Sequence, residues 1–272
     1  MKCVACGARP VGTDSGRCFG CAEAAPGWAA ALRPANGLAT ALNVLLGLGA
    51  VAALAVVVLD VWLDVLAGQL LDGADGVDPD TPAALGSVVH TFNGAVVPVG
   101  LATVVVFILW FHRTRGNADL LLPKGHRLGR GWTIGGWFTP IVMFWFPWQL
   151  MVDCWRASAP LDAEGRRRKP SESIVAVWWL TWMGSLILGR LATLKSTGFT
   201  VRDYADLESL RIGLRLETAE EVLRLVAAIT AILMVTRLTA MQRERRADIN
   251  PLAARAAQEA RVQAVTTPSA SA

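Results

Sequence analysis

Long apolar runs separated by short polar segments dominate the pattern of this chain. Crossing the hydrocarbon core of a bilayer takes about 20 helical residues, and four runs are long enough to do so. They lie at about Leu38 to Val61, Val88 to Phe111, Ile174 to Leu194 and Glu221 to Leu238. The first run consists almost entirely of Ala, Val, Leu and Gly. The pattern therefore predicts four transmembrane helices.

A fifth apolar stretch, from Trp132 to Met151, is interrupted by Gly135, Gly136, Pro140 and Pro147. The charge of the loops indicates whether this stretch crosses, because Lys and Arg concentrate in cytoplasmic loops. The loop after the first run carries Asp72, Asp75, Asp78 and Asp80 and no basic residue. Basic residues both precede the fifth stretch, from Arg113 to Arg130, and follow it, from Arg156 to Lys169. Both of its ends are therefore expected on the cytoplasmic side, which predicts a re-entrant or interfacial hairpin over residues 131–156. Five spans remain the alternative, since the charge rule is a bias and spans that contain proline exist.

The resulting fold is an all-α integral membrane protein with four transmembrane helices and both termini in the cytoplasm. We expect a cysteine-rich head at residues 1–24, a linker at 25–37, a membrane domain at 38–242 and a basic, partly disordered tail at 243–272. The composition agrees, because hydrophobic residues make up 53% and charged residues only 18%, against about 25% charged residues in a soluble domain. The net charge of +4 lies in segments that flank the apolar runs. Nucleic acid is therefore not expected as a partner, whereas anionic lipid headgroups are.

Four of the five cysteines fall within the first 21 residues, as the pairs Cys3 and Cys6 and Cys18 and Cys21. Two C-x-x-C pairs supply the four thiolates of a tetrahedral structural zinc site, which holds a fold together and leaves no open position for chemistry. Two disulfides or a redox site are the alternatives, and the reducing cytoplasm argues against disulfides. We expect a zinc-ribbon-like head with one structural zinc ion. The fifth cysteine, Cys154, is expected to be a small apolar filler.

Tryptophan is concentrated in the interrupted stretch, where five of the eleven residues lie between Trp132 and Trp155. Trp favours the boundary between membrane and water, which supports an interfacial hairpin. After Pro147, the residues Gln149, Asp153 and Arg156 share one helical face. The expected functional segment comprises Trp132, Gly135, Gly136, Trp137, Pro140, Pro147, Gln149, Asp153, Trp155 and Arg156. The alternative is that this segment only packs against the four spans, with Asp153 and Arg156 paired to each other.

Charged residues also gather toward the outer ends of the predicted spans, namely Asp60, His90, Arg190, Glu221 and Arg224. Ionisable groups at membrane depth are usually paired or functional. One interpretation is a belt of ion pairs between helices, with Arg190 or Arg224 bound to Asp60 or Glu221. The other is an outward-facing vestibule for a ligand or an ion. The middle of the spans offers only hydroxyls, which argues against a proton-coupled transporter.

The run from Gly131 to Ile141, with its sequence GWTIGGWFTPI, resembles the signature of a bacterial membrane family known as domain of unknown function 4328. The resemblance includes Pro147, Gln149, Asp153, Trp155, Arg156, Ala157 and Ser158, the upstream Arg113 to Ala118, and the pair Trp178 and Trp179. It extends over roughly Leu38 to Gln242, and members of this family often carry a zinc-ribbon-like head. The resemblance implies the architecture described above and no particular activity.

Three functions are compatible with these features. The first is a non-enzymatic scaffold or regulator of the bacterial plasma membrane, with a zinc head that binds a cytoplasmic protein. The second is a small transporter or channel in which the re-entrant segment lines the pathway, as irregular backbone at membrane depth can do. The third is an enzyme acting on lipid, with Asp153 or His112 as general base. No nucleophile motif, phosphate-binding glycine loop or catalytic metal spacing supports the third, so we expect no enzyme.

Overall fold

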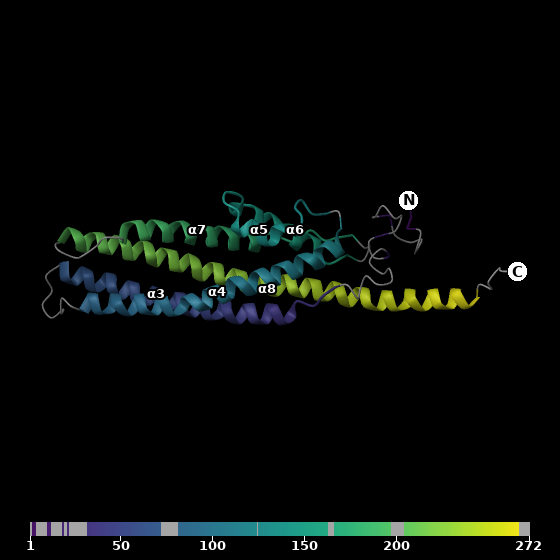
Figure 1. Cartoon of the computed structure of the whole chain (residues 1–272), viewed down its shortest axis with the longest axis horizontal. Coiled ribbons are helices and arrows are strands. Elements are labelled where there is room, and N and C mark those ends of the chain that lie inside the picture. Colours follow the sequence, from purple (N-terminus) through teal and green to yellow (C-terminus); the bar gives the residue numbers. More distant parts are fainter. Residues whose placement is uncertain are drawn as a thin grey trace. The chain divides into compact units, whose positions relative to one another are not determined.

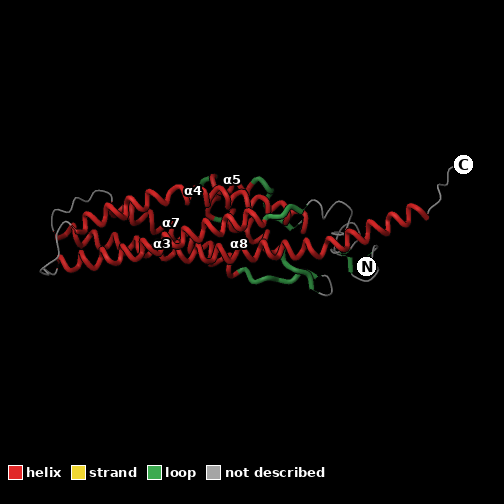
Figure 2. Tube along the Cα trace, turned by 90° about the horizontal axis from the view of Figure 1, so that it is seen from below, coloured by secondary structure: helices red, strands yellow, loops and turns green. Residues whose placement is uncertain are grey.

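The computed structural model describes residues 2, 3, 10, 11, 18, 21, 32–71, 81–123, 125–162, 166–196 and 204–266. This part of the chain forms six α-helices and one short 3₁₀ helix, and Figure 1 shows them as ribbons. They are α3 (Asn36–Leu71), α4 (Thr81–Leu121), α5 (Trp132–Phe138), η1 (Val142–Phe144), α6 (Phe146–Ala157), α7 (Ser173–Ser196) and α8 (Tyr204–Thr266). Figure 2 shows helices joined by loops and no strand among these residues. The all-α prediction is confirmed.

Four of these helices are long and apolar enough to cross a membrane. The qualifying segments are Asn36–Gln69, Val96–Leu121, Ser173–Thr193 and Arg211–Ala247. At most 28% of the most apolar window of each segment is buried inside the protein, so most of its side chains face outward, where lipid would cover them. The stretch from Trp132 to Met151 is not among them, because it forms α5, η1 and the first half of α6. Four helices of spanning length, and not five, are found in the described part of the chain.

The helices extend well beyond the apolar runs that predict them. Helix α4 continues through the basic segment as far as Leu121, and α8 runs from Tyr204 to Thr266. The sequence at both ends of α8 is rich in Ala, Leu, Glu, Gln and Arg, which are strong helix formers. Residues 243–266 of the expected tail are therefore helical, and 267–272 lie outside the described residues.

The chain divides into two compact units. We call residues 40–107 and 173–235 the span unit, and residues 1–39, 108–172 and 236–272 the hairpin unit. Helices α4 and α8 each contribute to both units.

Within the span unit, side-chain contacts link the helices in the order α3, α8, α7, α4. The guanidinium Nε of Arg211 on α8 lies 3.0 Å from a carboxylate oxygen of Asp64 on α3. Gly184 on α7 approaches α8 so closely that an added Cβ would lie 2.9 Å from Leu223. The ring of Phe107 on α4 stacks with a tryptophan ring of α7, with 5.7 Å between ring centroids. Small residues allow such close approach between membrane helices, where packing replaces the hydrophobic effect.

The core of the hairpin unit lies between α4, α6 and α8. Trp110 and Phe111 of α4, Leu150 and Met151 of α6, and Leu238 of α8 are completely buried. The Nε1–H of Trp110 donates a hydrogen bond to a threonine hydroxyl of α8 at 3.1 Å. This core fixes the base from which the α5–η1–α6 hairpin projects.

Candidate functional site

The glycines and prolines that interrupt the fifth apolar stretch build a tight helical hairpin. Helices α5 and α6 pack against each other at the buried Gly136 of α5, where an added Cβ would lie 3.4 Å from the Cβ of Phe146. Pro147 stands in the first turn of α6, where no intrahelical N–H bond is required. The ring of Trp132 meets the ring of Phe146 edge to face, with centroids 4.9 Å apart. The predicted hairpin over residues 131–156 thus matches α5, η1 and α6.

A strained turn forms the end of the hairpin. Ile141 has φ 68° and ψ −60°, and it is the only non-glycine residue with positive φ among the described residues. The Val142 N–H donates to the Pro140 carbonyl at 2.8 Å, which closes a γ-turn of the rarer, strained form. Such a conformation in a β-branched residue costs about 1–3 kcal/mol, which the surrounding structure must offset.

Large apolar side chains surround this turn and are exposed. Phe138 and Ile141 are each 69% exposed, and Phe144 is 51% exposed. We define the apolar tip as Trp132, Ile134, Phe138, Ile141, Phe144 and Trp145, all of them exposed. A cluster of exposed large apolar residues marks a surface that contacts a membrane or another protein. Trp132 and Trp145 at its margin suit a membrane boundary.

The polar residues of α6 anchor the hairpin by binding residues outside α6, and Asp153 and Arg156 do not pair with each other. The buried carboxylate of Asp153 accepts hydrogen bonds from the backbone N–H and the Nε–H of Arg127, both at 3.1 Å. A terminal nitrogen of Arg127 also donates to the Gln149 carbonyl at 3.2 Å. Arg156 instead binds Glu172, with N–O distances of 2.5 and 2.9 Å. The pairing of Asp153 with Arg156 is therefore absent, because each has a closer partner in a loop that flanks the hairpin.

Trp155 also differs from the expectation of a boundary residue. Its ring is 3% exposed, and its Nε1–H donates to the Ser171 carbonyl at 3.0 Å. Nearby, the guanidinium of Arg167 donates to the carbonyls of Ala157 and Leu121, the latter at 2.9 Å. These contacts place Trp155 in the core of the hairpin unit, where a carbonyl satisfies the polar end of the ring in place of interfacial water.

His112, the other candidate base of the enzyme hypothesis, connects α4 to α5. Its Nδ1 lies 2.9 Å from the Oγ1 of the buried Thr133. The single hydroxyl proton of Thr133 is directed to the Arg130 carbonyl at 2.7 Å. With the hydroxyl proton on that carbonyl, the Thr133 oxygen accepts a hydrogen bond from the Nδ1-protonated tautomer of His112.

A buried polar network that we call the amide clamp joins four segments of the hairpin unit. The Asn117 side chain exchanges two hydrogen bonds with the backbone of Arg33, at 2.8 and 3.0 Å, and donates to the Gln242 Oε1 at 2.9 Å. The Gln242 Nε2 donates to the Thr114 carbonyl and to the Ser158 hydroxyl, both at 2.9 Å. Sequence reasoning did not single out this pair. The one available signal was the presence of Thr114, Asn117 and Ser158 in the segments that carry the family resemblance.

The charged residues predicted to lie at the outer ends of the spans are only partly paired. Arg224 binds both Glu220 and Glu221 along α8, so an ion pair forms, but within one helix and not between helices. Arg190 is exposed, and the side chain of His90 lies outside the described residues. Among the described residues, the named charges therefore form one ion pair inside α8, Arg224 with Glu221, and the belt between helices remains a prediction.

Asp60 of α3 stands apart from this pairing. Its side chain is completely buried, and neither carboxylate oxygen has a hydrogen-bond partner within the described part of the chain. Its electrostatic neighbours are Glu217, Glu221 and Glu220 of α8. A buried carboxyl group facing other carboxyl groups is costly and is usually retained for a function.

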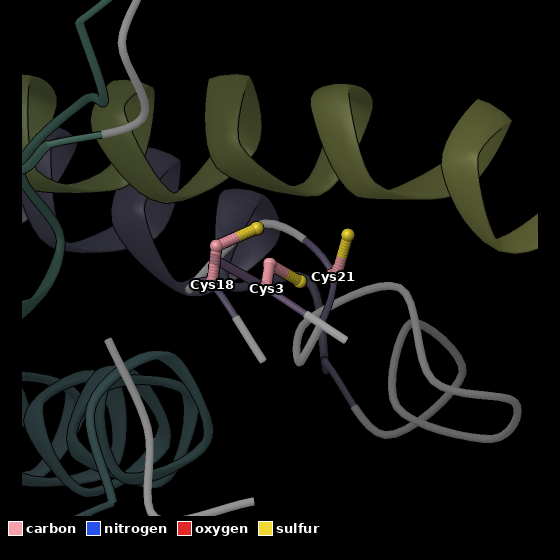
Figure 3. A group of neighbouring side chains, drawn as sticks. All are labelled: Cys3, Cys18 and Cys21. Atoms are coloured by element: carbon pink, nitrogen blue, oxygen red, sulfur yellow. The ribbon is translucent and has the colours of Figure 1, made fainter. Parts of the chain in front are cut away.

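Three of the four head cysteines are close together. The sulfur atoms of Cys3, Cys18 and Cys21 lie within 4.8 Å of one another, and Figure 3 shows their side chains gathered in one place. Cys3 and Cys18 are buried. A zinc ion bound at about 2.3 Å holds its sulfur ligands roughly 4 Å apart, so this set of donors fits zinc. Cys6 lies outside the described residues.

Comparison with known proteins gives one family. The family model described as domain of unknown function (DUF4328) matches residues 74–240, which is more than half of the chain. Comparison with curated proteins and with solved structures gives no match.

Proposed function

The chain belongs to the DUF4328 family, and from that premise we propose that it is a non-enzymatic, multi-pass scaffold or regulator of the bacterial plasma membrane. In this proposal both termini are cytoplasmic, and a head held together by one zinc ion binds a cytoplasmic protein. The hairpin holds that head at the membrane surface. The observation that supports the proposal most directly is the apolar tip on a strained and firmly anchored hairpin.

Burial in lipid explains why the apolar tip is stable. Apolar surface left in water costs about 25 cal/mol per Å², and Phe138, Ile141 and Phe144 are all more than half exposed. Acyl chains would remove that cost. The basic segment from Arg113 to Arg130 would contact anionic headgroups, each residue near the surface adding about 1 kcal/mol.

Spin-label accessibility in lipid nanodiscs tests the insertion of the tip. A label at position 141, introduced through a genetically encoded residue, should be accessible to oxygen and protected from a water-soluble nickel reagent. A label at Leu180, a 69% exposed residue of α7, serves as the lipid reference. A label at the exposed Arg168 serves as the water reference. A label at Ile141 that behaves like the one at Arg168 would refute the insertion.

Metal analysis and crosslinking test the head. The purified protein should contain about one zinc ion per chain, which the double variant Cys3→Ser/Cys18→Ser should lose while Cys154→Ser retains it. In cells, the intact protein should crosslink to a cytoplasmic protein that the zinc-free variant does not capture. Equal crosslinking by both proteins would remove the head from the proposal.

A small transporter or channel is the second candidate, and Asp60 is the observation that favours it. An unpartnered carboxyl group facing three glutamates could bind a proton or a cation within the span unit. Flux of protons or alkali cations into liposomes, abolished by Asp60→Asn, would support this candidate over the scaffold. The scaffold proposal expects no flux from either protein.

A further inference from the structure

A cavity of about 580 Å³ opens in the hairpin unit beside the last turns of α4. It lies between the segment that precedes α3, one face of α4 and the turn that leads into α5. Three arginines line it, Arg33, Arg113 and Arg130, together with His112 and Asn117. All these residues belong to the hairpin unit.

The three arginines have unused hydrogen-bonding capacity. Arg113 donates one bond, to the Pro34 carbonyl at 3.2 Å, and Arg130 makes one long contact to the His112 carbonyl at 3.5 Å. A guanidinium group carries five N–H donors, so most of theirs remain free for a ligand. None of the three forms an ion pair with a carboxylate of the described residues.

Of the residues that the structure describes, the one carboxylate that lines the cavity is already engaged. Asp119 lies 3.3 Å from a terminal nitrogen of Arg115 and 3.5 Å from the Nε2 of His126. Since Asp119 is paired with Arg115 of its own helix, its charge does not neutralise the lining arginines. The cavity therefore carries a net positive charge that suits an anion with several oxygen acceptors, such as a phosphate.

Glycine determines where one of these arginines lies. An added Cβ on Gly116 would be 2.8 Å from the Nη2 of Arg130, so the guanidinium rests directly on the backbone of α4. Leucines provide the apolar part of the lining, namely Leu38, Leu109 and Leu120. Leu109 is 52% exposed and lies within a segment of spanning length. A ligand that fills the cavity would thus meet cationic groups and hydrocarbon together.

We propose that this cavity binds a phosphate group, with Arg33, Arg113 and Arg130 as its ligands, and that the leucine lining admits the first part of an acyl chain when the phosphate belongs to a phospholipid. The inference rests on the proposed function, because it requires the hairpin unit to lie at the membrane surface. The bound anion would reduce the mutual repulsion of three arginines beside α4.

Native mass spectrometry of the protein in a neutral detergent tests the site. The ligands are phosphatidylglycerol, phosphatidylcholine and inorganic phosphate, each titrated separately. We expect one retained phosphatidylglycerol, bound at least about tenfold more weakly by the double variant Arg113→Gln/Arg130→Gln. The matched control Arg168→Gln removes an exposed arginine of the same unit that does not line the cavity, and its affinity should stay within about twofold of the parent. A milder variant, Gly116→Ala, keeps all three arginines but displaces the Arg130 side chain. It should weaken binding by a smaller factor than the double variant does.

Competition identifies the source of the phosphate. Displacement of the lipid by millimolar inorganic phosphate would support a site for the phosphate group alone, and resistance to it would support a phospholipid site. Unchanged affinity in the double variant, or an equal loss in Arg168→Gln, would overturn the proposal. If the variants overturn the cavity site but a label at Ile141 still lies in lipid, the proposed function stands without the cavity site.

Discussion

Ile141 combines three properties that conflict in a soluble protein, because it is β-branched, has positive φ and is 69% exposed. Glycine would relieve the strain, and a polar residue would relieve the exposure. Isoleucine does neither, which indicates that an apolar side chain is required at the end of the hairpin.

The variant Ile141→Gly should separate strain from insertion. Removing the β-branched side chain should raise the free energy of unfolding in detergent by about 1 kcal/mol, after allowance for the greater freedom of glycine in the unfolded chain. In nanodiscs the same variant should lose contact between the hairpin and lipid. Ile141→Val, which keeps the branching and most of the apolar surface, is the control for both measurements. A glycine variant less stable than the parent in detergent would contradict the strain argument.

His126 makes the hairpin unit sensitive to acid. Burial is the largest cause that lowers the pKa of this histidine, and the nearby Arg115 lowers it further, while Asp119 and Asp153 oppose the shift. The unfolded chain therefore binds a proton near pH 6.5, whereas the folded chain does so only at lower pH. The contribution of neutral, buried His126 to folding stability is therefore fully present above about pH 6.5. It is lost as the pH falls through the pKa that His126 has in the folded protein.

Thermal unfolding followed by near-ultraviolet circular dichroism should show this loss. The melting temperature of the parent should fall between about pH 7 and about pH 5, and that of His126→Gln should fall less over the same range. Parallel curves for the two proteins would exclude His126 as the source of the pH dependence.

At the scale of elements, the amide clamp holds the hairpin unit together through uncharged groups. Asn117 and Gln242 are 6% and 7% exposed, and each makes hydrogen bonds to more than one segment. The low local dielectric makes such a network strong when complete and costly when broken. Its loss should therefore affect the whole unit and not only one helix.

Gln242→Leu should lower the free energy of unfolding by about 2–3 kcal/mol, because it leaves buried donors and acceptors on Asn117, Thr114 and Ser158 unpaired. The double variant with Asn117→Leu should be less destabilised than the sum of the two single variants, since both remove the same bond. Gln149→Ala is the control, because its hydrogen bonds are made by backbone groups that the substitution keeps, and its effect should stay within about 0.5 kcal/mol. Denaturant titration in detergent measures the parent and all four variants. Additive losses would show that the two amides act independently.

Sequence patterns predict the spans and the hairpin because each is encoded locally. A run of about 20 apolar residues and a cluster of Gly and Pro are visible without knowledge of the fold. The partners of Asp153 and Arg156 could not be predicted, because Arg127 and Glu172 are brought to them by tertiary packing. Trp155 was misplaced for a related reason, since the amphipathic ring that suits an interface is equally suited to a core carbonyl.

The polar extensions of the helices could not be predicted from hydropathy either. Residues 204–210 and 248–266 continue α8 beyond its apolar segment, and nothing in their hydrophobic pattern distinguishes a helix from a charged loop. Helix propensity alone is a weak signal against that background.

At the scale of the whole molecule, topology is the property that all the proposals share. We expect the loop near Asp75 to be outside and the positions near Arg168 to be inside, because acidic and basic loops divide in that way. Cysteines placed at these two positions, treated in intact cells with a reagent that does not cross membranes, should be labelled only at the first. External labelling near Arg168 would convert the hairpin into a fifth span.

The amide clamp also has a consequence for the order of biosynthesis. Asn117 and Gln242 are 125 residues apart in the chain. A ribosome adding about 5–20 residues per second needs roughly 6–25 seconds to make the second amide after the first. During that interval the hairpin, the third span and most of the fourth are made, while Asn117 remains without the Gln242 amide. The hairpin unit can therefore close only when the last span arrives, and a chain truncated before Gln242 should remain open and be degraded by the membrane proteases that remove unassembled proteins.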